Sequence, residues 1–158
     1  MIYLIDEKKQ RQEKDYNWTR ERFETYKDFI SPIYSLDELQ EKAREIFQEE
    51  NIILYHESFL DKTDLNTKAF IKRDKLDEFS KKHNSYLVFF SGSKNSREIT
   101  ENIANIPVSV LYSNLEVFIN NIIKKDINLK YLLFGRNPDV EEELSKKSEE
   151  KNTDIKEQ

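Results

Sequence analysis

Residues 85–90 (SYLVFF) form the most strand-like stretch of this sequence, and the rest of the fold follows from the same pattern. A short run of apolar residues predicts a strand that is buried on both faces, as strands of parallel sheets are. The polar residues Ser91, Gly92 and Ser93 come directly after the run and end it. We therefore expect a sheet that is covered on both sides.

Short apolar stretches elsewhere in the chain predict further strands of this kind, at 1–5, 29–34, 52–55 and 107–112. Pro32 places the 29–34 strand at the outside of the sheet, because proline cannot donate a hydrogen bond to an inner ladder. A last apolar stretch, 129–134, is ambiguous between a strand and the end of a helix.

The segments between these strands carry helical patterns, which predict helices at 7–27, 35–47, about 67–84, 96–103 and 113–123. The best-specified helix begins at Ser35, which forms an S-x-x-E capping box with Glu38. Strands that alternate with helices predict an α/β domain with a doubly wound parallel five-stranded sheet, in the flavodoxin-like strand order 2-1-3-4-5. The alternative is a mixed sheet in which 129–134 is an antiparallel edge strand.

Length and composition indicate one domain followed by a tail. The chain has 158 residues, and its 10 Phe and 8 Tyr are too many for a wholly disordered protein. We place the domain at residues 1–135. Residues 136–158 hold 13 charged side chains with a net charge of −3, so we expect a disordered tail or a frayed helix there.

The composition also excludes several classes of site and partner. The absence of cysteine excludes disulfides, thiolate zinc sites and cysteine nucleophiles, and two glycines are too few for a GxGxxG or P-loop motif. A net charge of −5 argues against broad nucleic-acid binding. No apolar run is long enough to span a membrane and no signal peptide is visible, so we expect a cytoplasmic protein without a membrane partner.

Polar side chains at the carboxyl ends of the predicted strands are the candidate site, because doubly wound sheets bind ligands there. These residues are Asp6, Glu7, His56, Glu57 and Ser91. Asp6 and Glu7 could bind a divalent cation or cap a helix. His56 and Glu57 could form a proton-transfer pair, but neighbours on a strand point to opposite faces, so such a pair requires the strand to have ended.

Two of these stretches resemble response-regulator receiver domains. The stretch 2–7 (IYLIDE) is similar to a receiver's first strand, which ends in an acidic pair that holds Mg²⁺. Ser91, in 89–92 (FFSG), is similar to the Ser or Thr that ends a receiver's fourth strand. The resemblance covers about residues 1–126 and implies a flavodoxin-like fold. It also implies Mg²⁺ at Asp6 and Glu7 as the cofactor to consider, and we expect no other.

Two residues that receivers need are missing. A receiver carries a phospho-accepting Asp at the end of its third strand, where this chain reads 53–58 (ILYHES). It carries a Lys at the end of its fifth strand, where the predicted strand leads into 111–114 (LYSN). Without the carboxylate nucleophile, aspartyl phosphorylation as receivers perform it cannot occur.

We therefore expect a non-catalytic regulatory or protein-interaction module that keeps a receiver-like scaffold. Its partner would be another protein or a second copy of the chain. The resemblance places the contact surface near Val110, Tyr112 and Phe118. The alternative is a metal- or phosphate-dependent enzyme or a nucleotide binder that uses the strand ends. Convergence of the candidate side chains on one point would favour that alternative, and dispersal would remove it.

Overall fold

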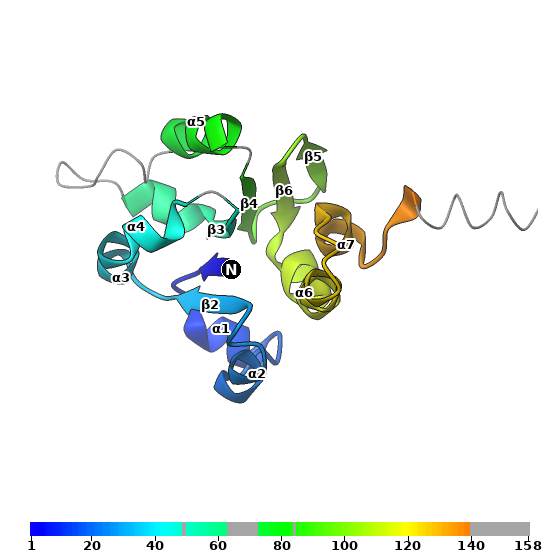
Figure 1. Ribbon diagram of the computed structural model, residues 1–158. Coiled ribbons are helices and arrows are strands. Elements are labelled where there is room, and N and C mark those ends of the chain that lie inside the picture. Colours follow the sequence, from blue (N-terminus) through cyan, green and yellow to red (C-terminus); the bar gives the residue numbers. More distant parts are fainter. Residues whose placement is uncertain (49, 63–72, 84, 140–158) are drawn as a thin grey trace, which may run out of the picture.

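The computed structural model describes residues 1–48, 50–62, 73–83 and 85–139. These residues form one six-stranded sheet with the order β2-β1-β3-β4-β6-β5 (Figure 1). The strands are β1 (Ile2–Ile5), β2 (Ile30–Ile33), β3 (Ile52–His56), β4 (Tyr86–Ser91), β5 (Glu98–Thr100) and β6 (Ile103–Pro107). Neighbouring strands pair in parallel, except β5 and β6, which pair antiparallel.

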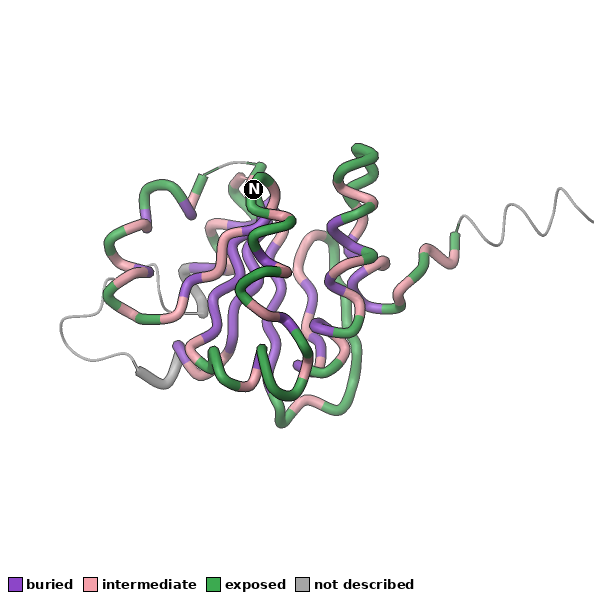
Figure 2. Tube along the Cα trace, turned by 90° about the horizontal axis from the view of Figure 1, so that it is seen from below, coloured by how far each residue is buried: buried purple, intermediate pink, exposed green. Residues whose placement is uncertain are grey.

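Helices cover both faces of the sheet. One face carries α1 (Lys9–Lys14), α2 (Arg20–Thr25), α6 (Val108–Ile123) and α7 (Leu129–Phe134). The other carries α3 (Leu36–Glu41), α4 (Ala43–Ile46), the 3₁₀ helix η1 (Glu57–Lys62) and α5 (Arg73–His83). Figure 2 shows the buried strands in purple between helices whose outer surfaces are exposed and green.

The inner strands β1, β3 and β4 are apolar up to their last residue because each of them lines two cores. In β1, Ile2 and Leu4 pack into the core beneath α6 and α7, whereas Tyr3 and Ile5 pack into the core beneath α3, α4 and α5. Successive side chains of a strand point to opposite faces, so a strand that is covered on both sides is apolar at nearly every position.

The α/β class, the alternation of strands and helices as far as β4, and the order of the first four strands are as predicted. Pro32 lies on the edge strand β2, also as predicted. The prediction of five parallel strands is wrong, because a sixth strand, β5, forms an antiparallel edge. The segment 129–134 is not that edge, since it forms α7 and packs against α6.

The strand predicted at 107–112 is wrong, because these residues lead into and begin α6. Pro107 is the N-cap residue of α6, and the helix starts at Val108. Buried residues of α6 recur at helical spacing: Val108, Leu111, Tyr112, Leu115, Phe118 and Ile119. The predicted helix started at Ser113, so it left out Val108, Leu111 and Tyr112, which belong to the same buried stripe. The apolar residues before Ser113 then looked like a strand.

The helix predicted at 96–103 is also wrong, because its place is taken by the β5–β6 hairpin. In β6, Ala104 and Ile106 are buried and their neighbours are half-buried, which is the alternation of a strand that is covered on one side. All three residues of β5 are exposed, so its sequence lacks the run of apolar residues by which a buried strand is recognised.

Two predicted helices are each divided in the structure. The helix expected at 7–27 is α1 followed by α2, with Asn17 between them at a φ of 56°. The helix expected at 35–47 is α3 followed by α4. The Ser35 hydroxyl accepts from the Glu38 N–H, as the capping box predicts, whereas the Glu38 carboxylate accepts from the N–H of Tyr34, one residue before the N-cap.

Some predictions fall outside the described residues. The first part of the helix expected from about residue 67 does so, and α5 is the part that the structure describes. Residues 140–158, which make up most of the predicted tail, do so as well. Within the described ranges, no helix has the length and apolar character needed to cross a membrane.

Gly135 ends α7 and provides a test of this packing. It has a φ of 70°, and a Cβ there would lie 2.9 Å from the Asn114 Oδ1. We expect Gly135→Ala to lower the free energy of unfolding by about 1–2 kcal/mol, because an L-residue is strained in the left-handed region. Urea unfolding measures this change. Gly92→Ala is the matched control and should change the free energy by less than about 0.5 kcal/mol, since nothing lies within 4 Å of its added Cβ. Equal effects of the two substitutions would contradict the prediction.

Candidate functional site at the carboxyl ends of the strands

The parallel register of β1 and β3 brings the first candidate residues together. Ile5 pairs with Tyr55, so the next residues along the two strands, Asp6 and His56, come side by side. Side chains alternate along a strand, so Asp6 points to the same face as Leu4, and His56 points to the same face as Leu54. This is the face that α6 covers. Asp6 is fully buried and His56 is 4% exposed.

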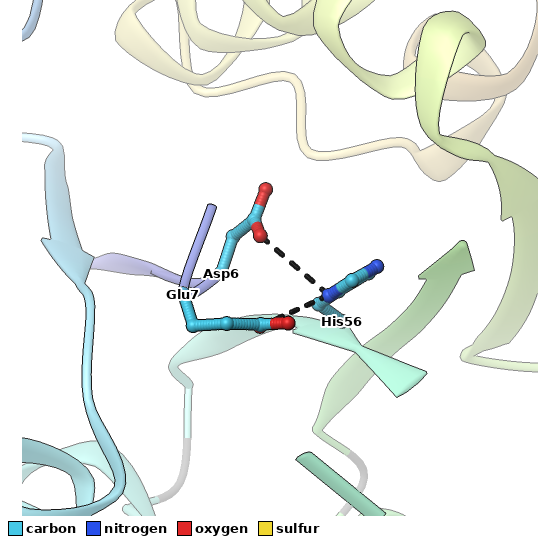
Figure 3. A group of neighbouring side chains, drawn as sticks. All are labelled: Asp6, Glu7 and His56. Carbon is cyan, nitrogen blue, oxygen red and sulfur yellow. Dashed lines mark hydrogen bonds and ion pairs between the residues drawn. The ribbon is translucent and has the colours of Figure 1, made fainter. Parts of the chain in front are cut away.

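Glu7 completes a cluster with these two residues (Figure 3). Its Oε2 lies 3.0 Å from the His56 Nδ1, and the Asp6 Oδ1 lies 3.5 Å from the same nitrogen. One oxygen or nitrogen from each of the three side chains lies within 4.8 Å of the others. Asp6, Glu7 and His56 therefore converge, which is part of the convergence that the enzyme alternative requires of all five candidate residues.

Glu57 and Ser91 make other contacts. β3 ends at His56, and Glu57 begins η1, where it forms an ion pair of 2.7 Å with Lys94. The Ser91 hydroxyl lies 3.1 Å from that of Ser93. The predicted partner of His56 was Glu57. In these contacts the carboxylate nearest the His56 Nδ1 is instead that of Glu7, which lies at the end of a different strand.

Donors from three directions hold the buried Asp6 carboxylate. The Lys8 N–H donates to Oδ1 at 3.0 Å, the Arg11 Nη2 lies 3.3 Å from Oδ2, and the Tyr112 hydroxyl donates to Oδ2 at 2.7 Å. Burial and the Asp6 charge raise the pKa of Tyr112 well above its usual value. The Tyr112 hydroxyl therefore stays protonated and acts as a donor to Asp6.

Sequence reasoning missed four residues of this network. Arg11 and Gln12 belong to α1, and Ser58 lies two residues after His56. Tyr112 comes from the first part of α6, which was predicted as a strand. Gln12 is fully buried, and its Nε2 donates to the Tyr112 hydroxyl at 2.8 Å. The one available signal was Gln12 itself, a polar residue inside a helix that packs on the sheet.

Two of the three residues that the resemblance placed at a contact surface are buried. Tyr112 is 2% exposed and Phe118 is fully buried, because both lie on the inner stripe of α6. Val110, on the same helix, is half-buried. This prediction is wrong for Tyr112 and Phe118, which belong to the core.

The contacts of His56 define its proton. An Arg side chain only donates hydrogen bonds, and the Arg11 Nη2 lies 3.5 Å from the His56 Nε2, so Nε2 is the acceptor. Nδ1 then carries a proton, which it donates to the Glu7 Oε2. The Ser58 hydroxyl donates to the other Glu7 oxygen and lies 2.6 Å from the same Nδ1.

These contacts exclude a Ser-His-Glu triad as it stands. In a triad, the serine and the acid contact opposite nitrogens of the imidazole, so that the ring takes the serine proton on one side while the acid holds the other. Here Ser58 and Glu7 both contact Nδ1. Ser58 also donates directly to Glu7, so His56 does not act as a base for its hydroxyl.

Glu7 is the residue of the cluster that reaches the surface. It lines an open pocket of about 440 Å³ together with Lys8, Lys9, Gln10 and Arg11 of the segment that begins α1. Burial by itself raises the pKa of Glu7, but the hydrogen bonds from His56 and Ser58 outweigh it and lower the pKa to about 2. Glu7 is therefore ionised at neutral pH, and its Oε2 lies 3.0 Å from the His56 Nδ1.

Comparisons of the chain with models of protein families, with curated proteins and with solved structures found no match. The chemistry of the site is thus inferred from its own geometry. Two carboxylates and an imidazole nitrogen that converge on one point can bind a cation, or they can hold one another in a hydrogen-bonded network.

The depressed pKa of Glu7 predicts a pH-dependent contribution to stability. A carboxyl whose pKa is about 2 when folded and about 4.3 when unfolded stabilises the fold above the unfolded value, by about 3 kcal/mol. This contribution is lost as the pH falls from about 4.3 towards 2. We expect Glu7→Gln to be less stable than the native chain at pH 7 and nearly equal to it near pH 2, in urea unfolding at each pH.

Glu24→Gln is the control for this measurement. The Glu24 side chain is 69% exposed and pairs with Lys27 on the surface, so its removal should change stability by less than about 1 kcal/mol. A deficit in Glu7→Gln that stays constant from pH 7 to pH 2 would contradict the assignment of the low pKa to Glu7.

Proposed function

We propose that the protein is a non-catalytic regulatory or protein-interaction module with a receiver-like scaffold. The observation that carries this proposal is the residue at the end of β3. His56 lies there beside Asp6 and faces the site, where a receiver has its phospho-accepting carboxylate. An imidazole in place of that carboxylate removes aspartyl phosphorylation from this position.

The arrangement of the strands supports the proposal. The parallel strands β2, β1, β3, β4 and β6 follow one another in the order that a receiver-like sheet requires, and β5 is an added edge. The strand next to β4 is β6, which ends in Ile106 and Pro107. The position of the receiver lysine is thus the end of β6 and not 111–114, and it carries no lysine.

The contacts of the other acidic residues also support it. Both oxygens of Asp6 accept hydrogen bonds, and the residue has no exposed surface from which to attack a phosphodonor. Glu57 is engaged by Lys94. Glu7 receives hydrogen bonds from His56 and Ser58, which lower its nucleophilicity. The expected partner is another protein or a second copy of the chain.

Incubation with acetyl phosphate and Mg²⁺ tests this proposal. We expect the intact mass of the full chain to stay unchanged, while an authentic receiver domain under the same conditions gains one phosphoryl group. A phosphoryl adduct on Asp6, Glu7, His56 or Glu57 would contradict the proposal. Hydroxylamine treatment would distinguish the acyl phosphates among such adducts from a phosphoramidate on His56.

The convergence of Asp6, Glu7 and His56 favours a second candidate function, a metal- or phosphate-dependent enzyme. The cluster lies at the carboxyl ends of β1 and β3, where doubly wound sheets place ligands, and Glu7 opens onto a pocket. In that case the carboxylates and the imidazole would hold a cation, and the cation would bind a phosphate-containing substrate.

Hydrolysis assays separate the two candidates. On the first proposal, phosphomonoester and phosphodiester substrates should show no turnover above background with Mg²⁺, Mn²⁺ or Zn²⁺. Turnover that is lost in His56→Gln and kept in His83→Gln would instead establish the second candidate. His83 is the appropriate control because the chain has two histidines and His83 lies at the end of α5.

A further inference from the structure

We propose that Asp6, Glu7 and His56 form a site for one late first-row divalent cation of the Zn²⁺ class, with the His56 Nδ1 as a ligand. The inference deepens the second candidate function, because it names the cation of the same site. It requires no catalysis, and an ion bound there could equally serve a regulatory module.

The distances from the two carboxylates to the His56 Nδ1 agree with shared coordination. Ligand atoms bound at about 2.0–2.2 Å to one ion lie about 3.0–3.5 Å apart when they are neighbours around it. The Glu7 Oε2 and the Asp6 Oδ1 lie 3.0 and 3.5 Å from the His56 Nδ1. Small rotations of these side chains would place an ion between them.

Each carboxylate is held by its far oxygen and directs the near one to His56. The far oxygen of Asp6, Oδ2, accepts from the Tyr112 hydroxyl at 2.7 Å. The far oxygen of Glu7, Oε1, accepts from the Ser58 hydroxyl. Residues that orient ligands through such outer hydrogen bonds are a regular part of metal sites. The Asp6 Oδ1 accepts from the Lys8 N–H at 3.0 Å and from the Arg11 Nη2 at 3.5 Å, so a lone pair is available to a cation once Arg11 moves aside.

A second observation comes from the buried layer behind the ligands. Gln12 is fully buried, and its Nε2 donates to the Tyr112 hydroxyl that holds Asp6. Its Oε1 has no hydrogen-bond partner among the described residues, although buried polar atoms nearly always have one. This buried acceptor indicates that the network can bind a further polar group beyond the contacts among its own side chains.

The charge of the cluster favours a cation. The His56 proton and the Arg11 side chain are what must move when the cation binds. Asp6 forms an ion pair with the Arg11 guanidinium, and Glu7 adds a second carboxylate that accepts from His56 and Ser58, so these contacts set two carboxylates against one guanidinium. Binding at Nδ1 transfers the imidazole proton to Nε2, which the Arg11 Nη2 now contacts at 3.5 Å. Arg11 is the group that moves aside, and its side chain is 19% exposed, which leaves room for this.

The ligand set determines the class of ion. Carboxylates and water suit Mg²⁺ and Ca²⁺, whereas an imidazole nitrogen suits Zn²⁺, Ni²⁺ and Cu²⁺. One nitrogen with two oxygens, and positions left for water, is therefore a Zn²⁺-type set. His56 makes this site different from the Mg²⁺ pair that Asp6 and Glu7 alone would form.

Titration of the full chain with Co²⁺ and with Zn²⁺ tests the proposal, by the visible absorption of Co²⁺ and by calorimetry. We expect one ion per chain and no displacement by a large excess of Mg²⁺. His56→Gln should weaken binding at least about 100-fold, since it removes a direct ligand, and His83→Gln should bind as the native chain does. Circular dichroism checks that both variants are folded.

A measurement on the native chain keeps the test decisive if His56→Gln fails to fold. In ¹⁵N NMR, added Zn²⁺ should shift the Nδ1 resonance of His56 and leave both nitrogens of His83 unchanged. Absence of binding, equal binding by the two histidine variants, or an equal response of the two rings would overturn the proposal. Cation binding without any turnover would uphold this proposal and remove only the second candidate function.

Discussion

Asp6 is a carboxylate at the end of an inner strand with no exposed surface, and the compensation of its charge organises the carboxyl-end site. An ionised group is costly to bury unless charged and hydrogen-bonding partners surround it. The Lys8 N–H, the Arg11 guanidinium and the Tyr112 hydroxyl supply these partners. Through them Asp6 joins β1 to α1 and α6, so the position of both helices over the sheet is linked to one carboxylate.

The same compensation shapes the chemistry of the site. Tyr112 occupies the Asp6 oxygen that points away from His56, and Ser58 occupies the corresponding oxygen of Glu7. Arg11 contacts both oxygens of Asp6. What remains is a pair of carboxylate oxygens facing one imidazole nitrogen. This geometry is unsuited to a receiver's phosphoryl switch and to a serine triad, and it is suited to holding a cation. A regulatory module and a metal-dependent enzyme both agree with it, and they differ in whether a substrate ever reaches the ion.

Much of the fold could be predicted because local signals were strong. The apolar runs at β1, β3 and β4 mark strands that are covered on both faces, and the Ser35 capping box marks the start of α3. The errors came from segments whose local signals mislead. The start of α6 is rich in β-branched and apolar residues, and Ser113 has the sequence of an N-cap. The buried stripe of the helix nevertheless continues on both sides of Ser113. β5 is short and exposed, so it depends on pairing with β6 for its conformation.

The candidate site could be predicted only in part, for a related reason. By itself the sequence determined which residues end the strands, because an apolar run must stop where polar side chains begin, and so it gave Asp6, Glu7 and His56 as candidates. Only the tertiary structure decided which of them meet. The β1–β3 register sets Asp6 beside His56, and the end of β3 turns Glu57 towards Lys94. It also decided that Arg11, Ser58 and Tyr112 complete the site, since contacts between residues up to 106 positions apart depend on how helices pack over a sheet and leave no local pattern.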